Sequence, residues 1–325
     1  MTSPFADYEV DEPLRPSGRE TGFDLEAALS SVVVLQARVP ADAFTAETLG
    51  VDRIGNGVVI GKDGLVLTIG YLMTEAEEIT LITNDGRRIA AHGLGYDTVT
   101  GFGLVHALEP LGLPALPLGN SKSLRAEDTV ILAGGGGRAH ALAGQLLARA
   151  PFAGYWEYLL DEALYTGPGH PHWSGAALIG PNGALVGVGS LQMVQETADG
   201  EQSLINMCVP IELLPPILDD LASGRAVQTP RPWLGLLSQD GGKGIVVLDV
   251  TRSGPADRAE VRRGDIILAV GGERVKTLAD FYTKLWALGP AGVSVPLRLQ
   301  REGDAFDVEI RSADRAARLK KRRLN

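Results

Sequence analysis

The sequence predicts a mainly β protein with two domains, and three observations lead to this prediction. Short apolar, β-branched runs alternate with turns that contain Asp-Gly or Asn-Gly. Glycine and proline are frequent, with 41 and 19 residues among 325, as expected for many short strands joined by tight turns. Near Pro230 the strand pattern begins again and now includes a helix, which indicates a second folding unit.

Hairpins organise the first part of the chain. An Asp-Gly or Asn-Gly pair between apolar runs is a strong hairpin signal, and many short strands at regular spacing indicate an all-β barrel or sandwich. After Pro210, residues 212–223 are expected to form a helix, and residues 222–231 a linker. The expected strands and hairpins occupy residues 31–35, 57–68, 79–89 and 176–188.

The second part of the chain mixes strands with two helices. Residues 255–259 indicate a short helix, and Thr277 is placed to cap a longer one. The apolar residues of the longer helix recur at helical spacing and so lie on one face; they are Leu278, Phe281, Leu285 and Leu288. The expected strands are residues 245–250, 266–270, 293–300 and 305–310.

Composition and charge exclude some classes of function. The hydrophobic content of 45% and the charged content of 22% are those of ordinary globular proteins. A formal net charge of −10 argues against nucleic acid as a partner, because phosphate binding rests on clustered lysine and arginine. Basic residues gather only in residues 311–325, which indicates a solvated terminus or, alternatively, a contact with an anionic partner.

Cysteine usage and the first residues bear on the compartment. Cys208 is the only cysteine, so no intrachain disulfide can form and nothing demands an oxidising compartment. Residues 1–10 lack the basic and apolar regions of a signal peptide, and no apolar run approaches the roughly 20 residues of a membrane span. We therefore expect a cytoplasmic protein without a membrane span, or a periplasmic one if a leader has been removed.

Several segments, taken together and in order, resemble the HtrA family of serine proteases. In the first part these are residues 55–60 and 113–128; in the second they are residues 233–236, 254–256 and 264–267. The resemblance implies a trypsin-like double β-barrel followed by a PDZ domain, which is a small β-sandwich with helices. It divides the chain into a flexible arm (1–22), a protease-like domain (23–224), a PDZ domain (230–311) and a basic tail (312–325).

The resemblance assigns each catalytic position to a residue of this chain. The turn that carries the family's histidine has Tyr71, and the position of its aspartate has Gly101. The nucleophile is retained as Ser174, but His172 replaces the glycine of the oxyanion hole. A serine without a base is a weak nucleophile, and tyrosine, with an unperturbed pKa of about 10, is a poor base at neutral pH.

These replacements predict a pseudoprotease in which Ser174 is a remnant. Loss of the serine or histidine of a triad costs roughly 10⁶ in kcat in subtilisin, and a side chain at residue 172 is expected to disturb the oxyanion donors. The alternative is an active serine endopeptidase of the quality-control type, with His170 or His172 as an unusual base. No metal or cofactor is expected, because this histidine pair has no cysteine or acidic ligand nearby in sequence.

The second domain retains the residues of a peptide-binding site. A PDZ domain adds a peptide to a sheet edge and holds its terminal carboxylate on backbone N–H groups. The resemblance makes Trp233, Leu234, Gly235 and Leu236 the carboxylate loop. Phe281 and Leu285 then face the peptide or belong to the core.

A pseudoprotease with an intact PDZ domain is expected to act as a binding or scaffolding protein. Its expected partners are protein C-termini or exposed apolar peptides. A third hypothesis is that the protein is a regulatory subunit, assembled as a homo-trimer or together with an active homologue.

Overall fold

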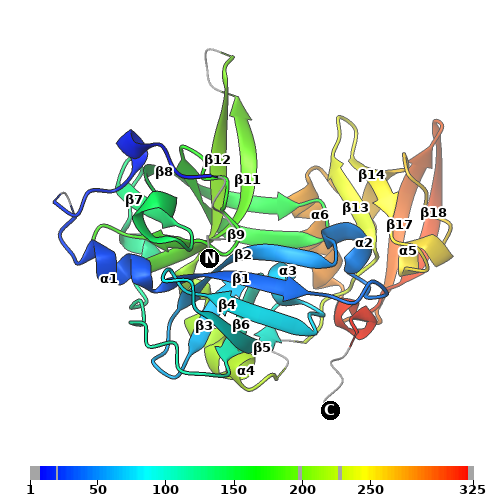
Figure 1. Cartoon of the computed structure of the whole chain (residues 1–325). Helices are drawn as coiled ribbons and strands as arrows, with labels where there is room; N and C mark the ends of the chain where they lie inside the picture. Colours follow the sequence, from blue (N-terminus) through cyan, green and yellow to red (C-terminus); the bar gives the residue numbers. More distant parts are fainter. Residues whose placement is uncertain (1–7, 20, 197–199, 226–228, 321–325) are drawn as a thin grey trace. The chain divides into compact units, whose positions relative to one another are not determined.

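The computed structural model describes residues 8–19, 21–196, 200–225 and 229–320. The chain forms two compact units. The first comprises residues 1–150, 162–227 and 320–325, and the second comprises residues 151–161 and 228–319. Both units are built mainly from strands (Figure 1), so the predicted fold class is confirmed.

The first unit begins with a closed barrel. Two of its turns carry Asp63-Gly64 and Asp85-Gly86, each with the glycine at positive φ, so both predicted hairpins are confirmed. Its interior is apolar, and Leu35, Leu81 and Val105 are fully buried. The strands, in barrel order, are β1 (Val32–Arg38), β2 (Asp52–Val59), β3 (Leu65–Ile69), β6 (Phe102–Ala107), β5 (Arg88–Tyr96) and β4 (Glu78–Ile82).

A second closed barrel completes this unit. The hairpin predicted around Asn182-Gly183 joins β10 to β11. Cys208 is a free thiol buried in the barrel core. The outer parts of β11 and β12 project away from the barrel (Figure 1). The strands, in barrel order, are β10 (Ala177–Ile179), β11 (Leu185–Glu196), β12 (Gln202–Pro210), β9 (Tyr158–Gly167), β8 (Ala141–Gly154) and β7 (Thr129–Ala133).

Short helical segments connect and cover the barrels. The single helix expected over residues 212–223 is wrong in detail. That stretch contains two 3₁₀ turns, Ile211–Leu213 and Pro215–Ile217, before the α-helix α4 (Leu218–Ala222). Pro215 and Pro216 have no N–H to donate to a continuous helix, which explains the interruption. The other helical segments of this unit are α1 (Leu25–Ser30), α2 (Ala46–Leu49), α3 (Gly70–Met73) and the 3₁₀ turns Glu12–Leu14, Ser121–Ser123 and Gly137–His140.

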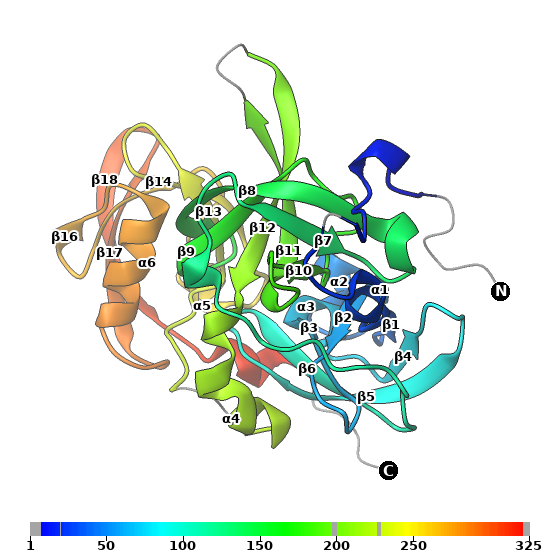
Figure 2. The same ribbon diagram turned by 90° about the vertical axis from the view of Figure 1, so that its left-hand side faces the viewer.

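The second unit is a sheet covered by helices. Figure 2 shows α6 (Leu278–Ala287) along this sheet, where it contacts β13 and β15. The predicted cap is confirmed, because Thr277 Oγ1 accepts a hydrogen bond from the N–H of Asp280 at 3.1 Å. The short helix expected near Pro255 is α5 (Pro255–Arg258). The strands are β13 (Leu236–Asp240), β14 (Ile245–Val250), β15 (Ile266–Val270), β17 (Ser294–Arg301) and β18 (Asp304–Arg311), with β16 (Glu273–Arg274) paired to β15.

Both ends of the described chain make specific contacts. Val10 is buried, and its N–H donates to the carbonyl of Ala139 at 2.9 Å. In the 3₁₀ turn Arg315–Arg318, the two arginines donate to backbone carbonyls of their own unit. The basic residues Lys321, Arg322 and Arg323 lie outside the described residues.

None of the helices within the described ranges has the length and apolar character needed to cross a membrane.

Candidate active site and carboxylate-binding loop

The positions that the resemblance assigns to base and nucleophile meet between the two barrels of the first unit. Tyr71 lies in α3, directly after β3, and Ser174 lies in the loop before β10. The Tyr71 hydroxyl oxygen is 2.8 Å from Ser174 Oγ and 2.7 Å from the carbonyl oxygen of Ser190. The structure therefore brings the tyrosine and the serine into direct contact.

The proton on each hydroxyl can be assigned. A phenol has one proton to donate, and a carbonyl oxygen only accepts. The Tyr71 hydroxyl therefore donates to Ser190 O, and Ser174 donates to the Tyr71 oxygen. The serine proton thus points at a neutral phenol, which has no capacity to take it as a general base.

Burial fixes this protonation state. Tyr71 is partly exposed as a residue, but its hydroxyl is withdrawn from water, and burial raises the pKa of the phenol to about 12. The hydrogen bond from Ser174 opposes this shift without overcoming it. The phenol therefore stays protonated across the physiological pH range.

The position expected for the orienting acid holds a turn glycine. Gly101 has φ +82°, in the left-handed region that glycine favours, and its carbonyl accepts a hydrogen bond from Gly70 N at 2.8 Å. The carboxylate of this turn belongs to Asp97, which is buried and accepts from Thr100 N at 2.8 Å. The turn is thus held by local bonds, and Gly101 has no side chain with which to orient a base.

Asn56 fixes the Ser174 loop, and the sequence analysis did not single it out. Its Nδ2 donates to the carbonyls of His172 and Ser174 at 2.9 and 3.0 Å, and its Oδ1 accepts from Gly135 N. Gly175 sits against the same strand with φ +74°, and a Cβ there would lie 2.0 Å from Asn56 O. Asn56 is fully buried in β2, and a buried amide requires such partners; the sequence alone does not show which residues they are.

The histidines beside Ser174 are engaged with one another and with the backbone. The N–H of His172 donates to His170 Nδ1 at 3.0 Å, so His170 carries its proton on Nε2 and donates it to His140 O at 3.0 Å. Burial lowers the pKa of His170 to about 4. Both ring nitrogens of His170 are therefore committed to groups other than Ser174.

The same bond affects the oxyanion hole. In trypsin-like enzymes this hole is formed by the backbone N–H of the nucleophile and that of the residue two positions earlier. Here the earlier N–H is that of His172, and it points at the ring of His170. The His172 N–H, at the position that the resemblance assigns to an oxyanion donor, thus has a partner within the chain.

In the second unit, the predicted carboxylate loop holds a carboxylate from the chain itself. Gly235 has φ +79°, and the N–H groups of Leu234, Gly235 and Leu236 converge on the side chain of Glu157. The N···O distances are 3.0, 2.7 and 2.9 Å. Glu157 was not foreseen from the sequence, and it belongs to residues 151–161, which fold with this unit.

The other residues predicted to bind peptide lie deeper. Trp233 is buried and pairs with Ala313 through two backbone bonds of 3.0 Å. Phe281 and Leu285 are fully buried in the apolar core of the unit. Their contact with a peptide stays a prediction. In this conformation both side chains pack in the apolar core of the unit.

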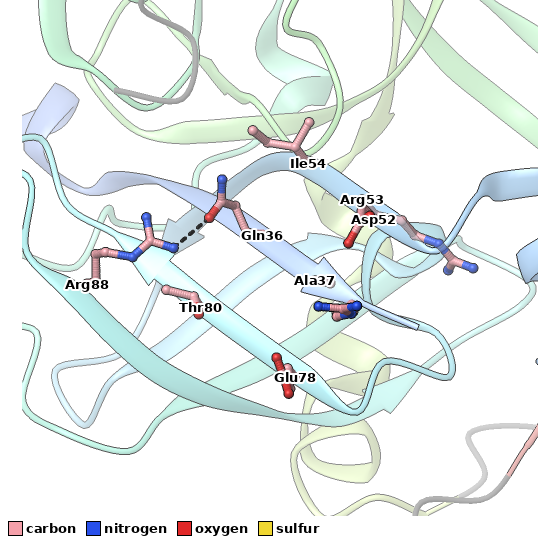
Figure 3. A pocket seen from close by; sticks show the side chains of 9 residues that line it. Gln36, Ala37, Asp52, Arg53, Ile54, Glu78, Thr80 and Arg88 are labelled. Carbon is pink, nitrogen blue, oxygen red and sulfur yellow. Dashed lines mark hydrogen bonds between the residues drawn. The ribbon is translucent and has the colours of Figure 1, made fainter. Parts of the chain in front are cut away.

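A polar hollow of about 400 Å³ lies on the outside of the first barrel. Its lining residues come from β1, β2, β4 and the first residue of β5, Arg88, which donates to Gln36 Oε1 at 2.8 Å (Figure 3). It contains none of the predicted site residues. Within the described ranges, no group of three or more His, Cys, Asp or Glu side chains is placed to hold a metal ion.

Comparisons with known families match both units. The trypsin-like peptidase domain family matches residues 55–188, and the PDZ domain family matches residues 232–311.

Two relatives are described as probable periplasmic serine endoproteases, DegP-like. The one from Halomonas elongata is 26% identical over 278 residues, which is 80% of this chain and 56% of the relative. The one from Pseudomonas fulva is 29% identical over 274 residues, 79% of this chain and 55% of the relative. The chain thus spans about half the length of these relatives.

Solved structures share the fold. The HtrA-type protease AlgW with a decapeptide superposes with a TM-score of 0.54 at 20% identity, covering 90% of this chain and 99% of that one. A serine endoprotease from Yersinia pestis gives 0.52 at 22% identity, covering 91% and 99%. The expected architecture, a trypsin-like domain followed by a PDZ domain, is confirmed.

Proposed function

We propose, from the likeness of this chain to HtrA-type proteases with a trypsin-like peptidase domain followed by a PDZ domain, that it is a pseudoprotease that binds peptides. One observation supports the loss of catalysis above all others. The hydroxyl of Ser174 donates its proton to Tyr71, a phenol that is itself bonded to Ser190 O.

The magnitude of the loss supports this proposal. Removing the histidine of a triad lowers kcat by about 10⁶ in subtilisin, and a phenol with a pKa of about 12 does not replace it. Gly101 removes the orienting acid, and the His172 N–H is turned away from the oxyanion position. Three separate parts of one catalytic apparatus are therefore missing or redirected.

A second candidate is an active serine endopeptidase that uses Ser174 with a non-standard base. The names of the relatives favour it, since they are described as serine endoproteases. In this structure the candidate requires His172 to turn toward Ser174, because His170 is committed on both nitrogens.

A fluorophosphonate probe separates the two candidates. We expect no labelling of Ser174 in the full chain under conditions that label trypsin completely. The Ser174→Ala variant is the matched control, since any reaction at other residues persists in it. Stoichiometric labelling located at Ser174 by mass spectrometry, and lost in Ser174→Ala, would establish the endopeptidase instead.

We further propose that the PDZ unit binds the C-termini of proteins. The converging N–H groups of Leu234, Gly235 and Leu236 support this, because they already hold a carboxylate. A C-terminal peptide library should yield binders that weaken when their carboxylate is amidated. Binding that is indifferent to amidation would contradict a carboxylate site.

Compartment, assembly and domain limits are part of the same proposal. The relatives are named periplasmic, which supports the periplasmic alternative over a cytoplasmic location. We propose residues 23–224 and 230–311 as the functional domains, with homo-trimers or mixed assembly with an active homologue as the arrangements to test by light scattering.

A further inference from the structure

Residues 155–157 lie beside β13, the edge strand of the second unit's sheet. The N–H of Ser238 donates to Tyr155 O at 2.8 Å, while Glu157 sits at the loop that ends at Leu236. Tyr155 thus lies opposite Ser238 and Glu157 opposite Leu236, which is the chain order of an antiparallel neighbour, joined to β13 by one backbone bond. Strand addition at a sheet edge, with the carboxylate at the loop, is the PDZ mode of binding.

The backbone leaves this path at Glu157. Its φ is +61°, a left-handed value that is uncommon for a residue with a side chain. The main chain therefore turns away from the loop at the point where a free peptide would end. The Glu157 side chain continues in its place and delivers a carboxylate to the N–H groups of Leu234, Gly235 and Leu236.

Further contacts hold the segment in place. Tyr282 of α6 donates its hydroxyl to Gly154 O at 2.9 Å and accepts from Glu157 N at 3.1 Å. Ala153 and Leu159 pack against the apolar core of the unit. Arg315 donates to Trp156 O at 3.3 Å. The segment is thus bound through backbone, carboxylate and apolar contacts together.

We propose that residues 152–157 are an internal ligand of the PDZ unit, with Glu157 in the place of a C-terminal carboxylate, so that a protein C-terminus binds only by displacing them. This inference rests on the peptide-binding function proposed above and adds its regulation. A tethered ligand competes at an effective concentration in the millimolar range when its linkers are short. The apparent affinity for an external peptide falls by the fraction of molecules whose loop is open.

The test uses the full chain and one defined probe. The probe is a fluorescein-labelled peptide with the sequence of residues 148–156 followed by leucine, with a free carboxylate. It keeps the register of Tyr155 and Trp156 and supplies a true terminus at the loop. Fluorescence anisotropy is measured for the wild type, Glu157→Ala and Glu157→Gln. Asp161→Asn is the matched control, since Asp161 is an exposed carboxylate in the same hairpin.

We expect Glu157→Ala to bind the probe at least about tenfold more tightly than the wild type, with Glu157→Gln in between and Asp161→Asn equal to the wild type. The amidated probe should bind none of them. Equal, carboxylate-dependent binding by wild type and variants would overturn the internal-ligand proposal and leave the peptide-binding function standing. Absence of probe binding in folded wild type and variants would reject both.

Hydrogen exchange on the wild type provides a measurement that needs no variant. Saturating probe should accelerate exchange in residues 152–160. These include Glu157, whose N–H donates a hydrogen bond to the Tyr282 hydroxyl. Unchanged exchange there while the probe binds would show that it occupies a different surface, and would also overturn the proposal.

Discussion

Tyr71 lies at the position that the resemblance assigns to a histidine, and a phenol and an imidazole differ in how they handle the serine proton. An imidazole offers a lone pair to the serine proton and can carry a positive charge afterwards. The Tyr71 hydroxyl donates to Ser190 O and accepts from Ser174. The contact that would activate a nucleophile thus becomes a link between α3, the Ser174 loop and β11.

This link predicts a stability effect for Tyr71→Phe. The variant removes the hydroxyl and leaves the Ser174 Oγ and the Ser190 carbonyl without that partner. A buried group left unsatisfied costs about 1–3 kcal/mol, and each kcal/mol corresponds to roughly 2–4 °C for a unit of about 150–250 residues. We expect calorimetry to show a lower unfolding midpoint for the first unit.

Tyr8→Phe is the control for that measurement. Tyr8 belongs to the same unit and is 40% exposed, so losing its hydroxyl should change the unfolding midpoint little. Identical midpoints for Tyr71→Phe and the wild type would mean that the link contributes nothing to stability.

At the scale of elements, the sequence predicts features that neighbouring residues specify, and it misses contacts between residues far apart along the chain. The turns at Asp63-Gly64 and Asn182-Gly183 are specified by adjacent residues, and both hairpins were predicted correctly. The resemblance assigned the carboxylate loop to residues 233–236, and the N–H groups of Leu234, Gly235 and Leu236 hold the Glu157 side chain. This occupant was missed, because Glu157 is 77 to 79 residues away along the chain and no local pattern marks a hairpin tip as a ligand. Asn56 was missed for the same reason, since its bond to Ser174 O spans 118 residues.

Strand β17 offers a matched pair of ion pairs for testing what stabilises the second unit. Arg301 donates two bonds, at 2.7 and 2.8 Å, to Asp265, whose side chain is 1% exposed. Arg298 pairs with Asp307 at 3.2 Å, and both side chains are more than half exposed. Removing one partner of a buried pair leaves an uncompensated charge and costs about 3–5 kcal/mol, whereas exposed pairs contribute about 0–1 kcal/mol.

We therefore expect Arg301→Ala to destabilise the second unit strongly and Arg298→Ala to leave it almost unchanged. Urea unfolding of the full chain, followed by tryptophan fluorescence, reports mainly on this unit, which holds Trp156, Trp233 and Trp286, whereas Trp173 lies in the first. Because the Arg301 side chain is 29% exposed, a loss toward the lower end of the range is expected. Equal losses in the two variants would contradict the distinction.

At the scale of the whole chain, the internal ligand is covalently held at both ends. Residues 151–161 fold with the second unit, while the strands that flank them continue into residues 141–150 and 162–167 of the first. The Glu157 carboxyl therefore stays close to the loop even when it is released. Its release depends on its protonation state, which the surrounding groups determine. Burial raises the pKa of Glu157 to about 7, and the N–H groups of Leu236 and Leu234, followed by the charge of Arg315, oppose this shift.

That pKa makes the competition between Glu157 and an external peptide for the loop depend on pH in a defined direction. The docked carboxyl has a pKa of about 7, above the ordinary glutamate value of about 4.3 that applies once it is released. Docking is therefore fully favoured below the released pKa and weakens as pH rises through the docked pKa. An external peptide should meet less competition from Glu157 at about pH 8 than at about pH 5.

The affinity ratio between Glu157→Gln and the wild type isolates this effect, because any titration of the peptide's own carboxylate in the loop affects both proteins alike. We expect the ratio for the labelled probe to shrink by about tenfold between about pH 5 and about pH 8, as measured by anisotropy titrations at constant ionic strength. Tyr282 also faces Glu157; burial raises the pKa of its phenol, which stays protonated throughout. A ratio that stays constant or widens with pH would show that the Glu157 carboxyl does not titrate in the loop.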